Sequence, residues 1–177
     1  MGSLMNSKKM ERALLGLIAV LTVALLWTIY DGIRERNVLV GDTAPAFSVV
    51  TDSGKTVTRS DFGGKVLVLN FWATWCPPCI EELPSLNQFQ KEMAASGVVV
   101  LGVSVDKNEN VYKNFLKRNG VVFETVRDPK TEISAEYGTY KYPETYVIDA
   151  MGKVRQKHIG QVNWMDPTVV SSIKGLL

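Results

Sequence analysis

The chain has 177 residues, which suits one modest domain, and 46% of them are hydrophobic while 21% are charged. This composition supports a packed core and argues against intrinsic disorder. The formal net charge is only +2 and comes entirely from the segment before Val38, so the remainder is neutral and shows no basic stripe. Nucleic-acid binding therefore has little support.

The first predicted element is an uncharged apolar run at residues 13–30, ALLGLIAVLTVALLWTIY. As a helix it would measure roughly 27 Å, close to the bilayer hydrocarbon thickness of about 30 Å. Trp27 and Tyr30 lie at one end, where amphipathic rings favour the membrane interface. We predict a transmembrane anchor at 13–30. Because three basic residues within 1–12 precede it, we expect that segment to be cytoplasmic.

Two alternatives compete with an anchor. A cleaved signal peptide is one, although the apolar run is longer than a usual signal core and no small-x-small cleavage site follows it. A buried core helix is the other, but no polar face interrupts the run. An anchor leaves residues 31–40 as a juxtamembrane linker and places 41–177 on the extracytoplasmic side, where disulfide chemistry takes place.

The elements expected within 41–177 alternate between strands and helices. A hairpin is expected around residues 52–55, and the helix after Cys76 has an apolar stripe at spacings of three and four. Asp166 and Pro167 suit the N-cap and first residue of a last helix. The stripe consists of Ile80, Leu83, Leu86, Phe89 and Met93. The other expected strands cover 65–71, 97–106, 121–126, 144–149 and 153–160, and the other expected helices cover 108–119 and 131–138. This order predicts an α/β fold with a central mixed sheet flanked by helices.

The two cysteines of the chain form the motif Cys76-Pro77-Pro78-Cys79 between a predicted strand and a predicted helix. A helix N-terminus carries unpaired N–H groups and a partial positive charge, so the pKa of the Cys76 thiol should be lowered. Cys79 follows one turn later on the same side. We therefore expect Cys76 to be an accessible nucleophile and Cys79 to resolve the mixed disulfide.

Two other uses of this cysteine pair are weaker. Zinc needs about four ligands, and two cysteines with the single histidine, His158, do not supply them, so no metal site is expected. A structural staple gains little, because closing so small a loop removes little chain entropy. His158 itself is expected to be structural.

The motif WATWCPPC after an apolar strand resembles the thioredoxin superfamily. The longer match, from GDTAPAFSVV through NFWATWCPPCIEELP, resembles its membrane-anchored TlpA/ResA/DsbE-like branch. The resemblance runs from about Gly41 to the C-terminus. It implies a thioredoxin-like fold with an N-terminal β-hairpin and an inserted helix–strand near 107–126. It also implies a redox-active disulfide between Cys76 and Cys79, with no cofactor.

The same resemblance singles out the segment KYPETYVID. It matches the loop that carries a cis-proline opposite the cysteines, so Pro143 is the expected cis-proline; an ordinary trans turn proline is the alternative. A cis bond there would leave the backbone of Tyr142 free to pair with a substrate strand. With Trp75 and Pro77, which flank Cys76, these residues form the expected substrate-binding surface.

Glu82 is the expected third catalytic residue. It lies one helical turn after Cys79, and the family often has an acidic residue near the thiols at this position. A partly buried carboxylate there would have a raised pKa and could relay a proton to or from Cys79. The alternative is that Glu81 and Glu82 are a solvated pair at the helix start. Asn70 stands where thioredoxins commonly have a buried aspartate, and it cannot carry that proton.

The function predicted is that of a membrane-tethered thiol–disulfide oxidoreductase in a bacterial periplasm. The resemblance implies a reductant that takes electrons from a transmembrane thiol reductase and passes them to exported cysteine proteins such as apocytochrome c. A copper-binding protein on the same scaffold is an alternative, although related copper proteins space their cysteines by three residues. A thiol peroxidase is another, but Thr74 lies two residues before Cys76, not three.

Overall fold

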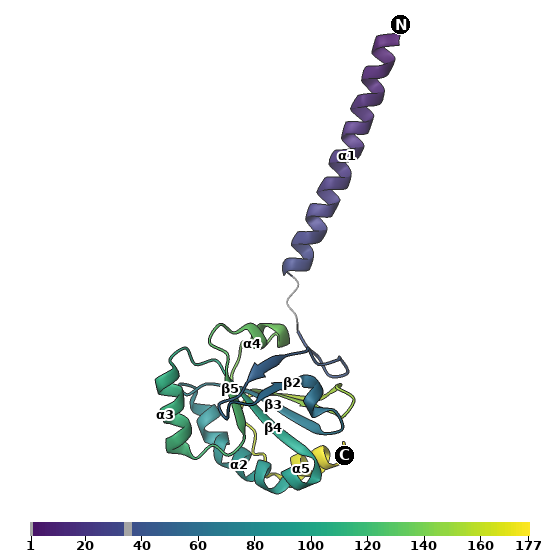
Figure 1. The fold of residues 1–177 in the computed structure, drawn as a ribbon. Coiled ribbons are helices and arrows are strands. Elements are labelled where there is room, and N and C mark those ends of the chain that lie inside the picture. The colour runs from purple at the N-terminus through teal and green to yellow at the C-terminus, as the bar shows by residue number, and fades with distance from the viewer. Residues whose placement is uncertain (1, 34–36) are drawn as a thin grey trace. The chain divides into compact units, whose positions relative to one another are not determined.

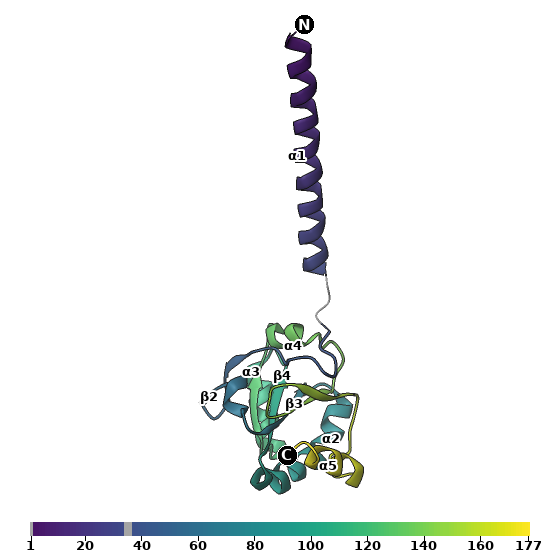
Figure 2. The ribbon, with the colours of Figure 1, turned by 90° about the vertical axis from the view of Figure 1, so that its right-hand side faces the viewer.

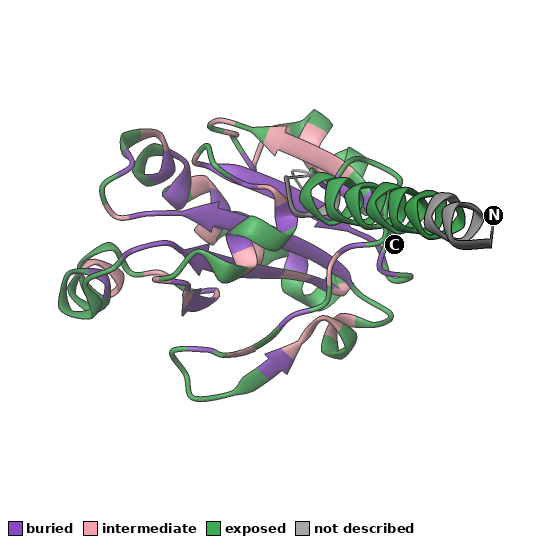
Figure 3. Cartoon of the chain, turned by 90° about the horizontal axis from the view of Figure 1, so that it is seen from above, coloured by how far each residue is buried: buried purple, intermediate pink, exposed green. Residues whose placement is uncertain are grey.

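The computed structural model describes residues 2–33 and 37–177. The first unit is helix α1 (Gly2–Ile33), whose segment Lys9–Tyr30 is long and apolar enough to cross a membrane and is fully exposed (Figure 3). The predicted anchor at 13–30 lies inside this segment. The helix continues into the predicted linker, whose residues 34–36 lie outside the described part of the chain.

The second unit is built on a five-stranded mixed sheet (Figures 1 and 2). Its strand order is β5-β4-β3-β6-β7, in which β3, β4 and β5 are parallel while β6 and β7 are antiparallel to their neighbours. A separate antiparallel hairpin, β1–β2, precedes it as predicted. The strands are β1 (Ser48–Val50), β2 (Thr56–Thr58), β3 (Val66–Trp72), β4 (Val98–Ser104), β5 (Glu124–Arg127), β6 (Glu144–Ile148) and β7 (Val154–Ile159).

The helices begin and end where local chemistry dictates. Asn108 accepts a hydrogen bond from the N–H of Val111 at the start of α3, and Gly120 takes the left-handed conformation that ends it. Asp166 caps α5 and Pro167 is its first residue, as predicted. The helices are α2 (Pro77–Met93), α3 (Glu109–Asn119), α4 (Glu132–Tyr137) and α5 (Pro167–Lys174), with short 3₁₀ turns at Arg59–Phe62 and Ala94–Ser96.

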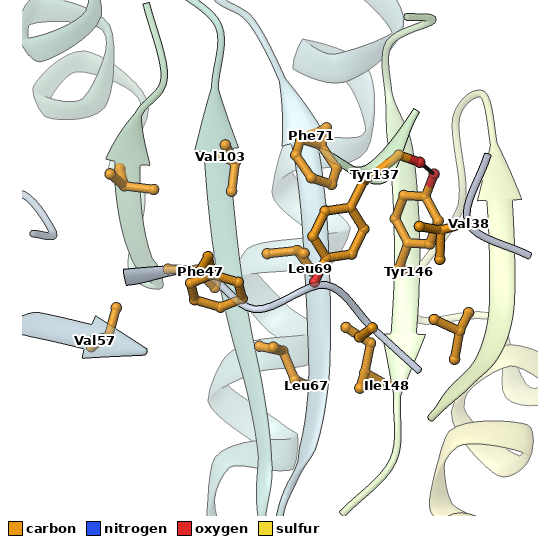
Figure 4. Packing of buried hydrophobic residues seen from close by; sticks show 14 residues of the cluster. Val38, Phe47, Val57, Leu67, Leu69, Phe71, Val103, Tyr137, Tyr146 and Ile148 are labelled. Atoms are coloured by element: carbon orange, nitrogen blue, oxygen red, sulfur yellow. Dashed lines mark hydrogen bonds between the residues drawn. The ribbon is translucent and has the colours of Figure 1, made fainter. Parts of the chain in front are cut away.

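The core is divided between the two faces of the sheet. One face carries Leu67, Leu69 and Phe71 of β3, which pack against Tyr137 of α4 and Tyr146 of β6 (Figure 4). On the other face, alternate residues of β3 and β4 pack under α2 and α5, with members such as Val68, Leu86, Phe89, Trp164 and Ile173. This arrangement is the thioredoxin-like α/β fold that the sequence predicts.

Two expectations about individual residues are wrong. Val38 falls in the predicted linker, but its side chain is buried in the first core cluster, so the packed domain begins before residue 41 in the sequence. Ile80 belongs to the predicted apolar stripe of α2, which should pack on the sheet, but it is 37% exposed, and the stripe is buried only from Leu83 onward. Ile80 lies in the first turn of α2, directly after Cys79.

Candidate active site

The disulfide between Cys76 and Cys79 lies at the N-terminus of α2. Cys76 is the N-cap residue of this helix, and its Sγ accepts a hydrogen bond from the backbone N–H of Cys79 at 3.3 Å. In the reduced protein the N–H of Cys79 and the helix dipole favour a thiolate at Cys76 over a thiol. The geometry therefore suits the predicted division between an attacking and a resolving cysteine.

The burial of the disulfide differs from expectation. Cys76 and Cys79 are each only 4% exposed, so the prediction of an accessible sulfur is wrong for this disulfide form. Both sulfurs pack against a small apolar cluster that includes Trp72 and Tyr112. The neighbours on the surface are exposed instead: Trp75 is 64% exposed, and Pro77 is also exposed. The residues on either side of Cys76 in the chain are therefore the exposed ones, while the sulfurs lie beneath the surface.

The loop that precedes β6 lies beside this site. The peptide bond between Tyr142 and Pro143 is cis, as predicted. The Tyr142 ring meets Trp75 edge-on, with ring centroids 6.0 Å apart and an interplanar angle of 86°. The carbonyl of Pro143 accepts a hydrogen bond from Gly160 at 2.8 Å, which joins the loop to the end of β7. The structure thus brings Tyr142 of the cis-proline loop against Trp75 and against the cluster that holds both cysteines.

Glu82 is buried one turn behind Cys79, with only 2% of the residue exposed, whereas Glu81 is exposed. Burial raises the pKa of Glu82 to about 7, although hydrogen bonds from the backbone of Val162 and from the Asn70 amide act in the opposite direction. Those bonds measure 3.1 Å and 2.8 Å. The carboxyl group can therefore exist in either protonation state near neutral pH.

Asn70 connects Glu82 to the sheet. Its Nδ2 donates one hydrogen bond to Oε1 of Glu82 and another to Oγ1 of Thr145, both at 2.8 Å. Asn70 and Thr145 are direct partners on the neighbouring strands β3 and β6. Asn70 therefore fixes the orientation of the carboxyl group while adding no titrating group of its own.

Sequence reasoning missed two buried aspartates at the carboxyl ends of parallel strands. Asp106 follows β4 and accepts hydrogen bonds from the backbone N–H of Thr74 at 2.9 Å and from the Thr74 hydroxyl at 2.6 Å. Asp128 follows β5 and accepts bonds from Glu132 and Ser134 at the start of α4. A signal was present in both cases, because an acidic residue stands within two residues of the end of a strand in VSVD and TVRD.

A third missed residue is Glu144, which follows the cis-proline directly. It is 2% exposed, pairs with Lys157 on β7 at 2.9 Å and accepts a hydrogen bond from the Tyr146 hydroxyl at 2.7 Å. Lys157 also donates to the carbonyl of Val38. This buried pair ties the strand behind the cis-proline to the segment by which the chain enters the domain.

Metal binding and the structural role of His158 can be judged from the same geometry. Among the described residues, no group of three or more His, Cys, Asp or Glu side chains is placed to hold a metal ion. His158 is half-buried, meets the Trp164 ring edge-on at 5.7 Å, and burial lowers its pKa. This environment keeps the imidazole neutral and packed, which suits a structural residue.

Comparison with known proteins agrees with this geometry. Residues 40–157 match the model of the AhpC/TSA family. The chain is 34% identical over 147 residues to thiol-disulfide oxidoreductase ResA of Bacillus cereus, a match that covers 82% of this chain and 85% of that protein. It is also 34% identical over 156 residues to thioredoxin-like protein YneN of Bacillus subtilis, covering 85% and 91%.

Solved structures of thiol:disulfide interchange proteins are also similar to this chain. A thiol:disulfide interchange protein of the thioredoxin family from Chlorobium tepidum superposes with a TM-score of 0.68 at 32% identity, covering 77% of this chain and 99% of that one. StoA from Bacillus subtilis superposes with a TM-score of 0.63 at 26% identity, covering 75% and 96%. The similarity thus covers the domain that holds the disulfide, the cis-proline and the buried glutamate.

Proposed function

Since the chain belongs to the AhpC/TSA family and is a thiol–disulfide oxidoreductase with a thioredoxin-like fold, we propose that it works while tethered to a bacterial cytoplasmic membrane by α1, with its domain in the periplasm. We propose further that it is a reductant of disulfides in exported proteins such as apocytochrome c, and that a transmembrane thiol reductase supplies its electrons. The apolar, exposed segment Lys9–Tyr30 supports the tether, and the disulfide at the start of α2 supports the chemistry.

The proposed reaction begins with the reduced protein. The Cys76 thiolate attacks one sulfur of the client disulfide, forming a mixed disulfide while the second client sulfur leaves as a thiolate and takes up a proton. Cys79 loses its proton and attacks the Cys76 sulfur, which releases the first client sulfur and closes the Cys76–Cys79 disulfide. The client has gained two electrons and two protons, and the donor reductase restores the dithiol.

Glu82 is proposed to carry the proton in the second half of this reaction. A carboxyl group with a pKa of about 7 can accept the Cys79 proton as the thiolate forms and return it when the dithiol is restored. Glu82 lies one turn from Cys79 on α2, and both are buried. Asn70 and the Val162 N–H hold the carboxyl group in place.

Trp75, Pro77, Tyr142 and Pro143 are proposed to receive the client. The first two flank Cys76 in the chain and are exposed, and the Tyr142 ring packs edge-on against Trp75. A thiol peroxidase would need a threonine hydroxyl beside the reactive sulfur, but the hydroxyl of Thr74 donates its hydrogen bond to Asp106. This arrangement favours disulfide exchange over peroxide reduction at this site. The two-residue spacing of the cysteines likewise differs from the three-residue spacing of related copper proteins, so it does not favour copper binding.

The observation that carries the proposal is the position of Cys76 as N-cap of α2, with Cys79 bonded to its sulfur. Its test is a trapping experiment with the full chain in its native membrane. Cys79→Ala cannot resolve the mixed disulfide, so we expect covalent adducts with exported cysteine proteins that mass spectrometry identifies and that reductant releases. Cys76→Ala, the matched control, should trap nothing.

Adducts in the Cys76→Ala chain would contradict the assignment of the nucleophile. The direction of electron flow has its own readout, because a reductant is kept as a dithiol by its donor. Acid-quenched alkylation of cells should find the native chain mostly reduced. A mostly oxidised pool would indicate an oxidase and would contradict the proposed direction.

A further inference from the structure

We infer that Asp106 is a positioning residue for disulfide exchange: its buried carboxylate holds the loop 73–75 and so sets the approach to Cys76. The inference rests on the proposed role of Cys76 as nucleophile. Asp106 lies 30 residues after Cys76 in the sequence and does not belong to the motif, the helix or the cis-proline loop. It reaches the site because β3 and β4 are parallel, so their carboxyl ends meet at one edge of the sheet.

Thr74 is the residue of this loop that donates hydrogen bonds to the Asp106 carboxylate. Oδ2 accepts the backbone N–H of Thr74 and the Ser104 hydroxyl at 2.7 Å, and Oδ1 accepts the Thr74 hydroxyl. Asp106 is only 3% exposed, so water does not replace these bonds readily. Both polar donors of Thr74 are thus held by a single rigid acceptor, which fixes the backbone and the side chain of the loop together.

The loop held in this way leads directly to the reacting sulfur. The N–H of Cys76 donates to the carbonyl of Ala73 at 3.2 Å, which closes a tight turn around Thr74. Trp75 extends from the same turn, is largely exposed, meets the Tyr142 ring and directly precedes Cys76 in the chain. A shift of the turn would therefore move Trp75 and the Cys76 sulfur together, away from the path of an incoming disulfide.

A carboxylate that accepts several bonds could instead act only on stability. The chain offers a matched comparison in Asp149, which is 9% exposed and accepts bonds from the N–H groups of Met151 and Lys153 and from Arg155. Asp149 lies at the opposite end of β6 from Pro143, in the turn that leads to β7. Loss of either carboxylate should cost stability, but only Asp106 should affect exchange.

The test compares two reactions of the reduced full chain in detergent, each followed across pH to its plateau, where Cys76 is fully ionised. Iodoacetamide reports only the thiolate, whereas a small disulfide peptide also requires an aligned approach past Trp75. Asp106→Asn removes one acceptor needed by Thr74. We expect its exchange plateau to fall about tenfold or more, while its alkylation plateau stays within about twofold of native. Asp149→Asn should keep both plateaus.

A double-mutant cycle links the effect to its contact. If Asp106 acts through Thr74, the loss from Asp106→Asn should shrink when Thr74→Val has already removed the hydroxyl. An exchange plateau within twofold of native in Asp106→Asn, with a melting temperature lowered as in Asp149→Asn, would overturn the inference and leave the proposed function intact. A native chain that alkylates but does not exchange would overturn the proposed function and remove the premise of the inference.

Discussion

The two faces of β3 differ in polarity although every residue of the strand is buried. On one face, Leu67, Leu69 and Phe71 lie in an apolar cluster beneath α4 (Figure 4). On the other face the strand begins with apolar residues under α2, but polarity enters at Asn70, which bonds to Glu82. Only the face under α2 changes from apolar to polar along the strand, and the change occurs toward the end of α2 that carries the disulfide.

This difference shows where the fold accepts a cost for function. Burying a carboxyl group is unfavourable unless it is hydrogen-bonded, and here burial raises the pKa of Glu82 to about 7. An apolar pair at Asn70 and Glu82 would pack the helix at least as well. If Glu82 carries a proton as proposed, the polar face serves the chemistry and the apolar face serves stability, and substitutions on the two faces should separate these properties.

The largest stability effect is expected on the apolar face, at Phe71. Its ring is fully buried and lies 5.4 Å from the Tyr137 ring and 5.9 Å from the Tyr146 ring, centroid to centroid. Phe71→Ala should lower the free energy of unfolding by about 3–5 kcal/mol, because it leaves a cavity among rings that cannot collapse. Denaturant titration followed by tryptophan fluorescence measures this, with the exposed Val50→Ala as a control that should change little.

The alkylation rate of Cys76 in the same variant tests whether the two faces of β3 are independent. In the folded fraction of Phe71→Ala that rate should match the native rate, because the cavity opens on the face away from α2. A rate changed by several-fold would mean that the two faces of β3 are mechanically coupled. The separation of stability from chemistry would then be wrong.

On the polar face, Glu82→Gln should change how stability depends on pH. In the native chain the folded state keeps a proton on Glu82 up to pH of about 7, whereas the unfolded chain releases it near the ordinary pKa of 4.5. Stability should therefore fall as pH rises from about 4.5 to 7, by a total on the order of 3 kcal/mol. Glu82→Gln has no proton to lose at this position, so its free energy of unfolding should rise relative to that of the native chain by about this amount between pH 4 and 8.

The exposed neighbour supplies the control for this prediction. Glu81→Gln removes the same charge from the adjacent position of α2, but Glu81 is solvated, so its substitution should leave the pH dependence of stability as in the native chain. Parallel stability curves for native and Glu82→Gln across this range would show that Glu82 ionises without penalty. It would then have no advantage as a proton carrier.

Much of the fold could be predicted because its signals are local. The buried run at 65–71, the alternation around Asp52-Ser53-Gly54-Lys55 and the cap at Asp166 each depend on neighbours in the sequence, and each element formed where it was expected. The two errors arose where tertiary packing decides. Val38 is buried because Tyr137 of α4 and Val154 of β7 share its cluster, and Ile80 is 37% exposed although it continues the apolar spacing of α2.

The site divides in the same way. Cys76 and Cys79 are grouped by their spacing at the start of one helix, whereas Glu82 and Pro143 were singled out through the family resemblance. Asp106 was missed because its partner Thr74 lies 32 residues earlier, and only the parallel pairing of β3 with β4 joins them. The burial of the sulfurs depends in the same way on α3, which contributes Tyr112 to their cluster.

The smallest effect is expected one strand farther from the disulfide, at Thr145. Its Oγ1 accepts the second Asn70 N–H, so Thr145→Val leaves one buried donor without a partner and should cost about 1–2 kcal/mol of stability. The Asn70–Glu82 bond does not pass through Thr145, so the pH midpoint of the stability curve should stay at its native value. A midpoint that moves upward would mean that Thr145 orients the Asn70 amide toward the carboxyl group, because loss of that bond removes an interaction that lowers the pKa of Glu82. The polar face would then be a single network that extends across β3 and β6 rather than a pair of residues beneath α2.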